Sequence, residues 1–267
     1  MTHPLIASPR NQHVAAARAL QDRKGRTAAS AFLVEGPHAV AAALAAGWQL
    51  RDLFVTPAAA AREQSLVAAA AGDGVAVRLV ADRVLTAIAE TTTPQGVVAV
   101  VAQRRQPELP AGARLVAALV GAADPGNVGT VIRTADAAGA DAVVLTAGSA
   151  DVWSGKVVRA SAGSLFHLPV VTGVAAAQLV TRLREAGLTV LATAADGEAD
   201  LDTLIDTAAL EVPVAWLFGN EAHGIDGAIR AAADQVVRLP IYGAAESLNL
   251  GAAAAICLYA SARAQRR

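Results

Sequence analysis

The stretch LVAALVGAADPGNVGTVIRTADAAGADAVVLT at residues 115–146 decides the fold of this chain. It opens with an unbroken apolar run at 115–121 and passes through a turn that contains proline and glycine. It then continues with apolar residues on one side of a helix and ends in a second apolar run at 141–146. Apolar runs of this length are typical of parallel strands that are buried on both faces. The stretch therefore predicts a strand, a helix and a second strand.

The same alternation extends in both directions along the chain. We predict strands at 31–36, 50–56, 75–80, 96–102, 168–171, 188–195, 213–220 and 235–241, and helices at 11–23, 38–47, 58–71, 82–90, 153–167, 175–187 and 247–264. In the C-terminal part, five or six strands alternate with helices, which favours an α/β fold with an open parallel sheet. No internal repeat is present beyond this alternation.

The length of 267 residues, at roughly 150 residues per domain, favours two domains. The clearest linker is QRRQPELPAGAR at 103–114, which combines two prolines and a glycine with several charges. We therefore expect a smaller α/β domain at 1–105, a linker at 106–112 and a second domain at 113–267.

The composition limits the class of protein. Apolar residues make up 54% of the chain and charged residues 17%, so the chain can bury a core and is not disordered as a whole. The longest apolar runs fall short of the roughly 18–20 residues of a membrane span, and the N-terminus lacks the pattern of a secretory signal. The single cysteine, Cys257, excludes an intramolecular disulfide framework. A cytoplasmic location fits these features.

The net charge of −1 conceals an asymmetry between the two halves. Residues 1–105 hold eleven Lys and Arg against seven Asp and Glu (+4), whereas residues 106–267 hold eleven against sixteen (−5). The excess of positive charge is densest near the start, which predicts an RNA-binding patch; an arginine-rich composition without a binding role is the alternative for any single cation. The predicted RNA-binding residues are Arg10, Arg18, Arg23, Lys24 and Arg26.

Three segments that follow strands could carry chemistry, because ligands of open α/β sheets bind at the carboxyl ends of the strands. They are DPGNVGTVIRTADAAG at 124–139, LFGNEAHGI at 217–225 and LPIYGAAESLNLGAAAAICLY at 239–259. Taken singly, each could be an ordinary turn, loop or helix cap. Together, they offer three strand ends at which glycine lets the main chain approach a nucleotide-like ligand. No G-x-G-x-x-G follows a strand and no phosphate-binding P-loop is present, which argues against a nicotinamide dinucleotide or a nucleoside triphosphate.

In order and spacing, these three segments resemble motifs one, two and three of the SpoU/TrmH branch of the SPOUT RNA methyltransferases. The resemblance covers about residues 113–260. It implies methylation of an RNA ribose 2′-hydroxyl with S-adenosylmethionine as the donor, a C-terminal domain threaded into a trefoil knot, and a homodimer. The knot is expected from the resemblance alone. Composition and periodicity do not indicate it, and true knots are rare exceptions to the usual topology.

The N-terminal half resembles the substrate-binding domain, similar to ribosomal-protein-type RNA binders, of family members that modify ribosomal RNA. A basic helix precedes FLVEGPHAVAAAL at 32–44 there. The resemblance favours 23S rRNA as the substrate. The alternatives are a tRNA ribose methyltransferase and a non-catalytic RNA-binding or ribosome-assembly protein. The modified nucleotide, and the choice between a housekeeping and an antibiotic-resistance role, stay open.

The resemblance also implies roles for particular residues. The residues that match the catalytic positions are Asn127, Arg133, Glu221, Ser247 and Asn249, and those that match the cofactor-binding positions are Thr193, Gly219, Leu239 and Leu248. Two short departures from the family pattern, Ala222-His223 and Leu250-Gly251, could alter loop geometry.

The proposed chemistry needs alignment of the reactants and removal of one proton from the hydroxyl. Arginine loses its proton only above about pH 12, so Arg133 is either an unusual base or a clamp on the adjacent phosphate that orients the hydroxyl. We expect no metal site, because His167 and His223 are isolated and the acidic segment at 196–206 fits no calcium loop. We predict that this acidic segment is a solvated connection and that Cys257 is a core residue.

Overall fold

The computed structural model describes residues 4–104, 106 and 108–266. Contacts divide the chain into two compact units. The first unit holds the residues up to Arg104 together with Asp151–Phe166, and the second holds Arg105–Ala150 and the residues from His167 onward. The division after Arg104 lies next to the predicted linker at 106–112, of which residue 107, like residue 105, lies outside the described residues. The assignment of Asp151–Phe166 to the first unit differs from the expected domain at 113–267.

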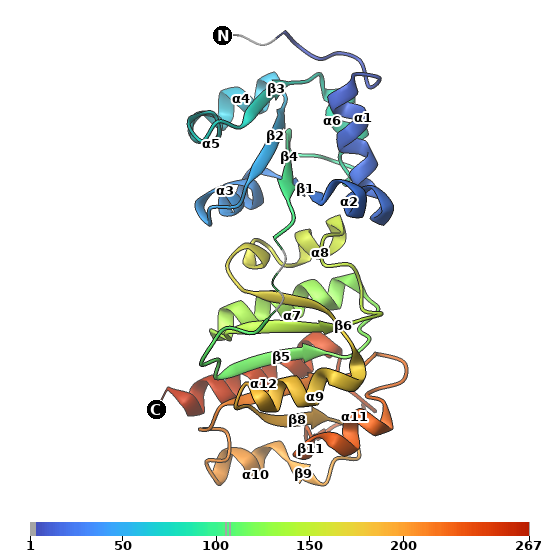
Figure 1. The fold of residues 1–267 in the computed structure, drawn as a ribbon, viewed down its shortest axis with the longest axis vertical. Helices are drawn as coiled ribbons and strands as arrows, with labels where there is room; N and C mark the ends of the chain where they lie inside the picture. Colours follow the sequence, from blue (N-terminus) through green and yellow to red (C-terminus); the bar gives the residue numbers. More distant parts are fainter. Residues whose placement is uncertain (1–3, 105, 107, 267) are drawn as a thin grey trace. The chain divides into compact units, whose positions relative to one another are not determined.

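A four-stranded mixed sheet forms the centre of the first unit (Figure 1), with the strand order β1-β4-β2-β3. The strands are β1 (Ala31–Glu35), β2 (Leu50–Val55), β3 (Ala76–Leu79) and β4 (Val97–Ala102). Strand β4 lies antiparallel between β1 and β2, and β3 joins β2 in parallel. A buried cluster, which includes Leu33, Phe54 and Val98 of the sheet and Leu85 of a neighbouring helix, forms the core on one face.

Short helices surround this sheet. They are α1 (Gln12–Arg18), α2 (Arg23–Ala29), α3 (Pro37–Ala45), α4 (Pro57–Arg62), α5 (Gln64–Gly72) and α6 (Asp82–Ile88). The helix predicted at 11–23 is wrong in extent, because the extended residue Asp22 separates α1 and a 3₁₀ turn (Ala19–Gln21) from α2. The Asp22 carboxylate accepts a hydrogen bond from Gly25 N and so starts a new helix.

The segment Asp151–Phe166 contributes helix α8 (Gly155–Ala160) and a 3₁₀ turn (Ser164–Phe166) to the first unit. It replaces the single helix predicted at 153–167. Its aromatic side chains pack on β1: the Phe32 and Trp153 rings lie 4.9 Å apart between centroids, and the Trp48 and Phe166 rings 5.3 Å apart. Trp48 Nε1 also donates a hydrogen bond to the Phe166 carbonyl oxygen. This buried aromatic cluster fixes the segment to the unit.

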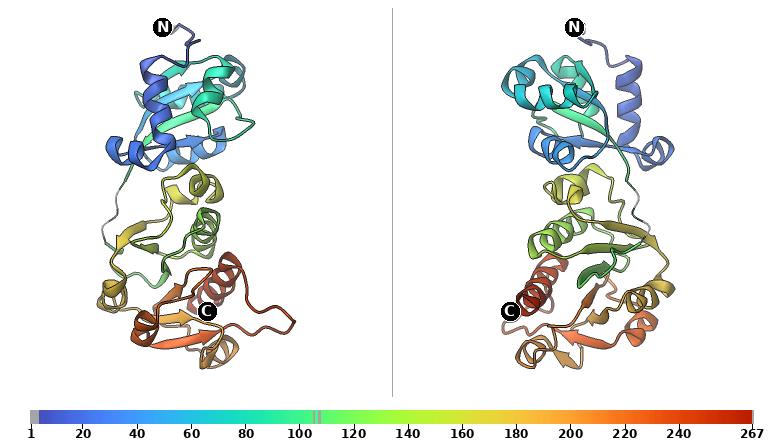
Figure 2. Two further views of the ribbon diagram at one scale, coloured as in Figure 1. Left: turned by 90° about the vertical axis from the view of Figure 1, so that its right-hand side faces the viewer. Right: turned by 60° about the vertical axis from the view of Figure 1, so that its left-hand side comes forward.

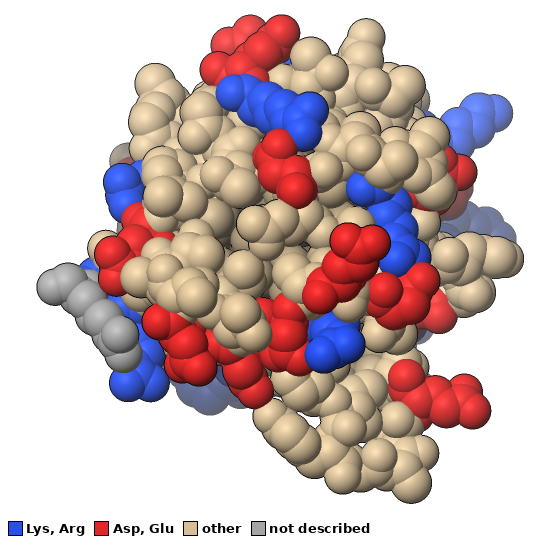
Figure 3. All heavy atoms as spheres, turned by 90° about the horizontal axis from the view of Figure 1, so that it is seen from below, with Lys and Arg blue, Asp and Glu red and all other residues tan. Residues whose placement is uncertain are grey.

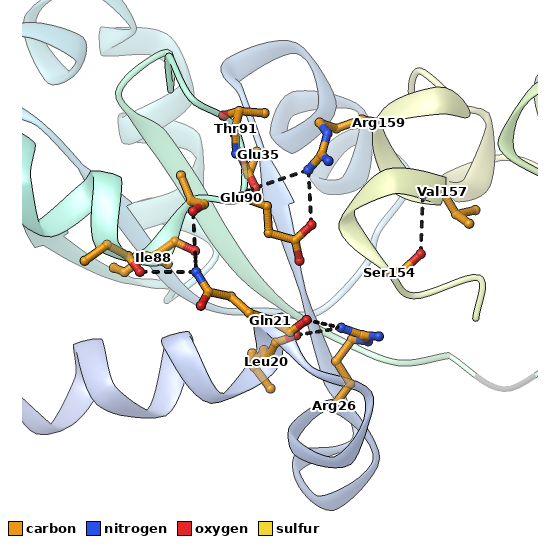
Figure 4. Close-up of polar contacts among 12 residues, drawn as sticks. Leu20, Gln21, Arg26, Glu35, Ile88, Glu90, Thr91, Ser154, Val157 and Arg159 are labelled. Atoms are coloured by element: carbon orange, nitrogen blue, oxygen red, sulfur yellow. Dashed lines mark hydrogen bonds and ion pairs between the residues drawn. The ribbon is translucent and has the colours of Figure 1, made fainter. Parts of the chain in front are cut away.

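Charged contacts reinforce this attachment. The Arg26 guanidinium bonds to the Asp151 carboxylate at 2.8 and 2.9 Å. It also donates to the carbonyl oxygens of Leu20 and Gln21 (Figure 4). The Arg26 and Asp151 side chains are 6% and 16% exposed, so the ion pair is largely withdrawn from water. Nearby, Arg159 of α8 contacts the carboxylates of Glu35 and Glu90.

A seven-stranded sheet forms the centre of the second unit, with the order β7-β6-β5-β10-β8-β11-β9. Every pair of neighbouring strands in it is parallel, which confirms the predicted α/β fold with a parallel sheet. The strands are β5 (Leu115–Leu119), β6 (Ala142–Thr146), β7 (Val170–Val174), β8 (Thr189–Thr193), β9 (Ala199–Asp200), β10 (Val214–Phe218) and β11 (Gln235–Arg238).

Helices cover both faces of this sheet (Figure 2). They are α7 (Pro125–Ala138), α9 (Ala176–Glu185), α10 (Leu201–Asp206), α11 (Gly227–Ala232) and α12 (Leu250–Gln265). On one face, α9 and α11 pack over a core that includes Ala118 and Leu217. On the other face, α12 packs against α7, and Trp216 Nε1 of β10 donates a buried hydrogen bond to Ser261 Oγ. Among the described residues, no helix is long and apolar enough to cross a membrane.

Two predicted elements of the second unit need correction. The acidic segment at 196–206 is not a plain solvated connection, because it forms β9 at the sheet edge and α10, whose Leu201 and Leu204 are buried. The last helix starts at Leu250 and not at 247, because Asn249 is its N-cap residue.

We predict that Asp151→Asn lowers the free energy of unfolding by about 2–4 kcal/mol, because the buried Arg26 guanidinium would lose its only charged partner among the described residues. Urea denaturation at neutral pH measures this loss. Asp73→Asn is the matched control, since Asp73 is an exposed residue at the end of α5 in the same unit. Equal stability of the two variants would contradict the structural role of the pair.

Candidate active site

The segment at 124–139 follows β5 and forms the whole of α7 with its two cap residues. Asp124 is the N-cap residue of this helix, and its carboxylate accepts a hydrogen bond from Asn127 N at 2.8 Å. Asn127 therefore lies in the first turn, and its side chain is free to reach other loops.

The segment at 217–225 leaves β10 through Gly219 and closes into a tight turn. Asn220 N and Gly224 N each bond to the carbonyl oxygen of the other residue, at 3.0 and 2.8 Å. A Cβ atom at Gly219 would lie 2.3 Å from the Gly224 carbonyl carbon, so only glycine fits there. The Asn220 side chain donates to the Gly121 carbonyl oxygen at 2.8 Å and so joins this turn to the loop after β5.

The segment at 239–259 runs from the end of β11 into α12. The Asn249 Oδ1 atom caps this helix by accepting from Gly251 N at 2.8 Å. A Cβ atom at Gly251 would lie 2.7 Å from Thr130 Cγ2 of α7. The close approach at Gly251 sets the end of the third loop beside the start of α7.

A chain of side-chain amides joins the three loops. Asn249 Nδ2 donates to Asn127 Oδ1 at 3.0 Å, and Asn127 Nδ2 donates to Glu221 Oε1 at 2.9 Å. Each amide accepts through its oxygen and donates through its nitrogen. The chain ends on the Glu221 carboxylate, because an ionised carboxylate accepts hydrogen bonds and cannot donate them. The structure therefore brings Asn127, Glu221 and Asn249 together, as their expected common role requires.

A cavity of about 740 Å³ lies between these loops. Its lining includes eight of the predicted site residues: Asn127, Thr193, Gly219, Glu221, Leu239, Ser247, Leu248 and Asn249. Thr193 ends β8, and its hydroxyl donates to the Leu217 carbonyl oxygen at 2.9 Å. The volume is that of a site for a nucleoside-sized ligand, and the lining combines apolar side chains with a few polar groups and main-chain atoms.

Arg133 is the exception among the predicted catalytic residues. It lies six residues after Asn127 on α7, which at about 100° per residue places it on a different face of the helix. Its side chain is exposed, and it is not among the residues that line the cavity. Within one chain, the structure therefore does not bring Arg133 to the other catalytic residues.

Four of the five predicted RNA-binding residues are exposed in the first unit, namely Arg10, Arg18, Arg23 and Lys24. Arg26 is not available in this way, because its guanidinium is buried and bonds to Asp151 and to two carbonyl oxygens. The expectation for Arg26 is thus wrong: it is an internal structural residue. The sequence gives no sign of this burial, because Arg26 lies in a run of basic residues.

Other side chains add little reactivity to the site. Cys257 is fully buried in α12, and this burial raises the pKa of its thiol, so the residue is a core residue as expected. Among the described residues, no three or more His, Cys, Asp or Glu side chains gather where they could hold a metal ion. Sequence reasoning missed the bridging role of Asn220, although an asparagine directly after the glycine at a strand end was the available signal.

We predict that Gly219→Ala destabilises the protein by about 2 kcal/mol or more, because the added methyl group meets the main chain of Gly224 and Ile225, which cannot move aside as a flexible side chain would. Chemical denaturation measures the change. Gly227→Ala is the control, since no atom lies within 4 Å of a Cβ at that position. A Gly219→Ala variant as stable as the control would show that the turn has a different conformation.

Comparison with known proteins agrees with this site. Residues 114–259 match the family model described as the SpoU rRNA Methylase family, and residues 11–99 match the MRM3-like substrate binding domain. The chain is 36% identical over 254 residues to the 23S rRNA (guanosine(2553)-2′-O)-methyltransferase RlmP of Bacillus subtilis, with 95% of this chain and 97% of the relative covered.

Two solved structures are similar along almost the whole chain. One is the AdoMet-bound rRNA methyltransferase from Sinorhizobium meliloti, with a TM-score of 0.85, 33% identity and 97% of each chain covered. The other is the SpoU methyltransferase AviRb from Streptomyces viridochromogenes in complex with AdoMet, with a TM-score of 0.82, 33% identity and coverage of 96% of this chain and 98% of that chain. With its three loops, its cavity and both matched regions in agreement, the chain belongs to the SpoU rRNA methylase family.

Proposed function

We propose that this protein transfers a methyl group from S-adenosylmethionine to a ribose 2′-hydroxyl of 23S rRNA. The observation that carries the proposal is the cavity between three strand-end loops that Asn249, Asn127 and Glu221 hold together. The similarity to RlmP, which acts on 23S rRNA by its name, supports the choice of substrate. The names of the two AdoMet-bound neighbours support the choice of donor.

The residues that line the cavity fit this donor. Leu239, Ile241 and Leu248 offer an apolar surface for an adenine ring, and Gly219 is part of the cavity lining. Thr193 and the main chain of the three loops supply polar groups around them. When bound, S-adenosylmethionine supplies a methyl group that its sulfonium has already activated.

The protein then has to align the hydroxyl and assist the loss of its proton. Asn249 bonds to Asn127, and Asn127 bonds to Glu221. These bonds fix the orientation of the three side chains at the cavity wall, where they can contact the ribose and the donor. We assign Arg133 to the phosphate next to the target ribose, because a guanidinium forms two parallel hydrogen bonds with a phosphate and stays protonated near neutral pH. In this role, Arg133 orients the hydroxyl and stabilises the negative charge that develops as the proton leaves.

We propose a homodimer in which Arg133 serves the cavity of the second copy. Arg133 lies on an exposed stripe of α7 with Thr130 and Ala137. Beside it, α12 carries two large apolar residues that are exposed in the single chain, Ile256 at 44% and Tyr259 at 52%. Exposed apolar side chains on α12 and a cation on the helix packed against it are typical of an interface between copies.

The first unit would bind the RNA outside the target nucleotide. Its exposed residues Arg10, Arg18, Arg23 and Lys24 offer positive charge to phosphates, and the match to a substrate binding domain supports this role. We also propose that the C-terminal segment of the second unit is threaded as a trefoil knot, as the family resemblance implies. Finally, we propose that the protein works without a metal and in the cytoplasm, where its RNA substrate is found.

The test is a map of 2′-O-methyl groups on total rRNA and tRNA from cells with and without the gene. Loss of one methyl group in 23S rRNA, restored by the wild-type gene and not by an Arg133→Ala variant, is the expected result. Loss confined to tRNA would contradict the proposed substrate. Unchanged methylation, together with no binding of S-adenosylmethionine, would favour a protein that only binds RNA.

We predict that Arg133→Lys lowers kcat/KM by about 10- to 100-fold, because an ammonium cannot form the paired hydrogen bonds of the guanidinium. A pH–rate profile of both enzymes checks the role. A guanidinium that only binds a phosphate keeps its proton over the whole pH range of the assay. The wild-type profile should therefore show no inflection that is missing from the profile of Arg133→Lys. A near-normal rate with lysine would show that the fork geometry is unimportant.

We predict that Ile256→Glu produces a monomer, because it places a charge in the proposed apolar interface. Size-exclusion chromatography with light scattering measures the mass, and methylation assays should show loss of activity with it. Leu5→Glu is the control, since Leu5 is 51% exposed and belongs to the first unit, whereas α7 and α12 belong to the second. If both variants have the wild-type mass, the α7 and α12 face is not the interface.

A further inference from the structure

The loop at 239–249, here called the motif-three loop, forms a large part of the cavity wall but has no helix or strand of its own. It is the extended segment between β11 and α12 in Figure 2. Residues 241–249 are all exposed, and the loop includes Gly243, Ala244 and Ala245, which have little side chain to pack. A loop of this kind samples many conformations, and each ligand that it binds must overcome the entropy of ordering it.

Side chains near both ends of this loop form hydrogen bonds with other elements. Asn249 bonds to Asn127 at the end of the loop, as described above. Near its start, the Tyr242 hydroxyl donates to Asp202 Oδ2 of α10 at 2.8 Å. The two bonds restrain the loop at both ends and leave the residues between them free to meet a ligand.

The structure holds Asp202 firmly. Asp200 accepts a hydrogen bond from Asp202 N at 3.0 Å, and its second carboxylate oxygen bonds to Arg238 Nε at 3.0 Å. Arg238 is the last residue of β11, so the strand that leads into the loop and the helix that carries Asp202 are joined directly. Buried Leu201 and Leu204 fix α10 to the second unit.

The acidic side chains near this loop have different partners. Figure 3 shows the end of the second unit that carries α10 and β9, where red carboxylates and blue cations lie among neutral residues. Asp196 pairs with Arg230 and Asp200 with Arg238, whereas Asp202 bonds to the hydroxyl of Tyr242. Asp202 is thus the acidic residue of this segment that holds the motif-three loop.

We propose that Asp202 is a positioning residue for the methyl donor: through the Tyr242 hydroxyl it holds the motif-three loop in a conformation ready to bind. This inference rests on the proposed function, because it assumes that S-adenosylmethionine occupies the cavity. The Tyr242 side chain is 89% exposed, so packing of its ring restrains the loop very little and the hydroxyl is the part that does so. The same bond raises the pKa of Tyr242, since loss of the phenol proton would place a second negative charge beside Asp202.

Two single variants and their combination test this tether. Tyr242→Phe removes only the hydroxyl, and Asp202→Ala removes only the acceptor. In the free protein, hydrogen–deuterium exchange of residues 239–249 should be faster in both variants than in the wild type. Calorimetry should give a Kd for S-adenosylmethionine that is about three- to tenfold higher in each. The double variant should be no weaker than either single variant, because one interaction has been removed in all three.

Kinetics and two control variants separate the tether from other roles. With saturating donor, kcat should stay within about twofold of the wild type while the KM for the donor rises, since an ordering cost affects binding of the donor. Asp206→Ala is the matched control, because Asp206 is an exposed acid on the same helix. If it weakens donor binding as much as Asp202→Ala does, general attraction between acidic residues and a cationic donor explains the effect and the tether is overturned.

Tyr242→Ala distinguishes the hydroxyl from the ring. If Tyr242→Phe behaves as the wild type while Tyr242→Ala weakens RNA binding, the ring is a surface for an RNA base and the tether is overturned. If Tyr242→Ala changes the mass of the protein in solution and does not weaken binding of the methyl donor, Tyr242 belongs to a protein interface and the tether is overturned. A wild-type protein that binds no donor contradicts the proposed function, whereas the exchange measurements on free protein still decide whether the tether exists.

Discussion

One chain of hydrogen bonds joins the three loops of the candidate active site. Asn249 donates to Asn127, which donates to Glu221, and the chain joins loops that are far apart in the sequence. An amide can continue such a chain because it carries a donor and an acceptor, and an ionised carboxylate can end it because it only accepts. If a residue that only donates replaced an acceptor in this chain, or the reverse, two donors or two acceptors would face each other. The three loops would then lose the hydrogen bonds that join them. The cavity that they enclose depends on this order.

The parallel sheet makes the chain of amides possible. Strands β5, β10, β8 and β11 are neighbours in this order, so the segments that follow them leave the sheet along one edge. Asn220 joins the first two of these segments through the Gly121 carbonyl oxygen, and Thr193 at the end of β8 bonds to Leu217 of β10. The close packing of Gly251 on Thr130 then sets α12 against α7. Apolar strands and small residues thus place the polar groups before any ligand contributes.

Much of this site could be predicted from the sequence, because each of its loops follows an apolar strand and because the three segments together resemble the motifs of the SpoU/TrmH family, which implied the site residues. The predicted residues Asn127, Glu221, Ser247 and Asn249 all line one cavity. What the sequence did not indicate depends on contacts between distant residues. Trp153 and Phe166 pack with Phe32 and Trp48, and Arg26 is buried by Asp151, 125 positions away. The predicted start of α12 at 247 is too early for a related reason: Asn249 caps the helix, and its side chain also bonds to Asn127, which is distant in the sequence.

The charge of the cavity supports the proposal that a second copy completes the site. Its described lining includes two carboxylates, Asp124 and Glu221, and no Lys, Arg or His. A surface of this kind suits a cationic donor but does not attract the phosphate that accompanies every ribose in RNA. The positive charge that such a phosphate needs must come from outside the lining, and Arg133 is a cation placed on an exposed face of the helix that begins at the cavity. The separation of charges within one chain therefore favours a site completed by a second copy, with the first unit holding the rest of the RNA.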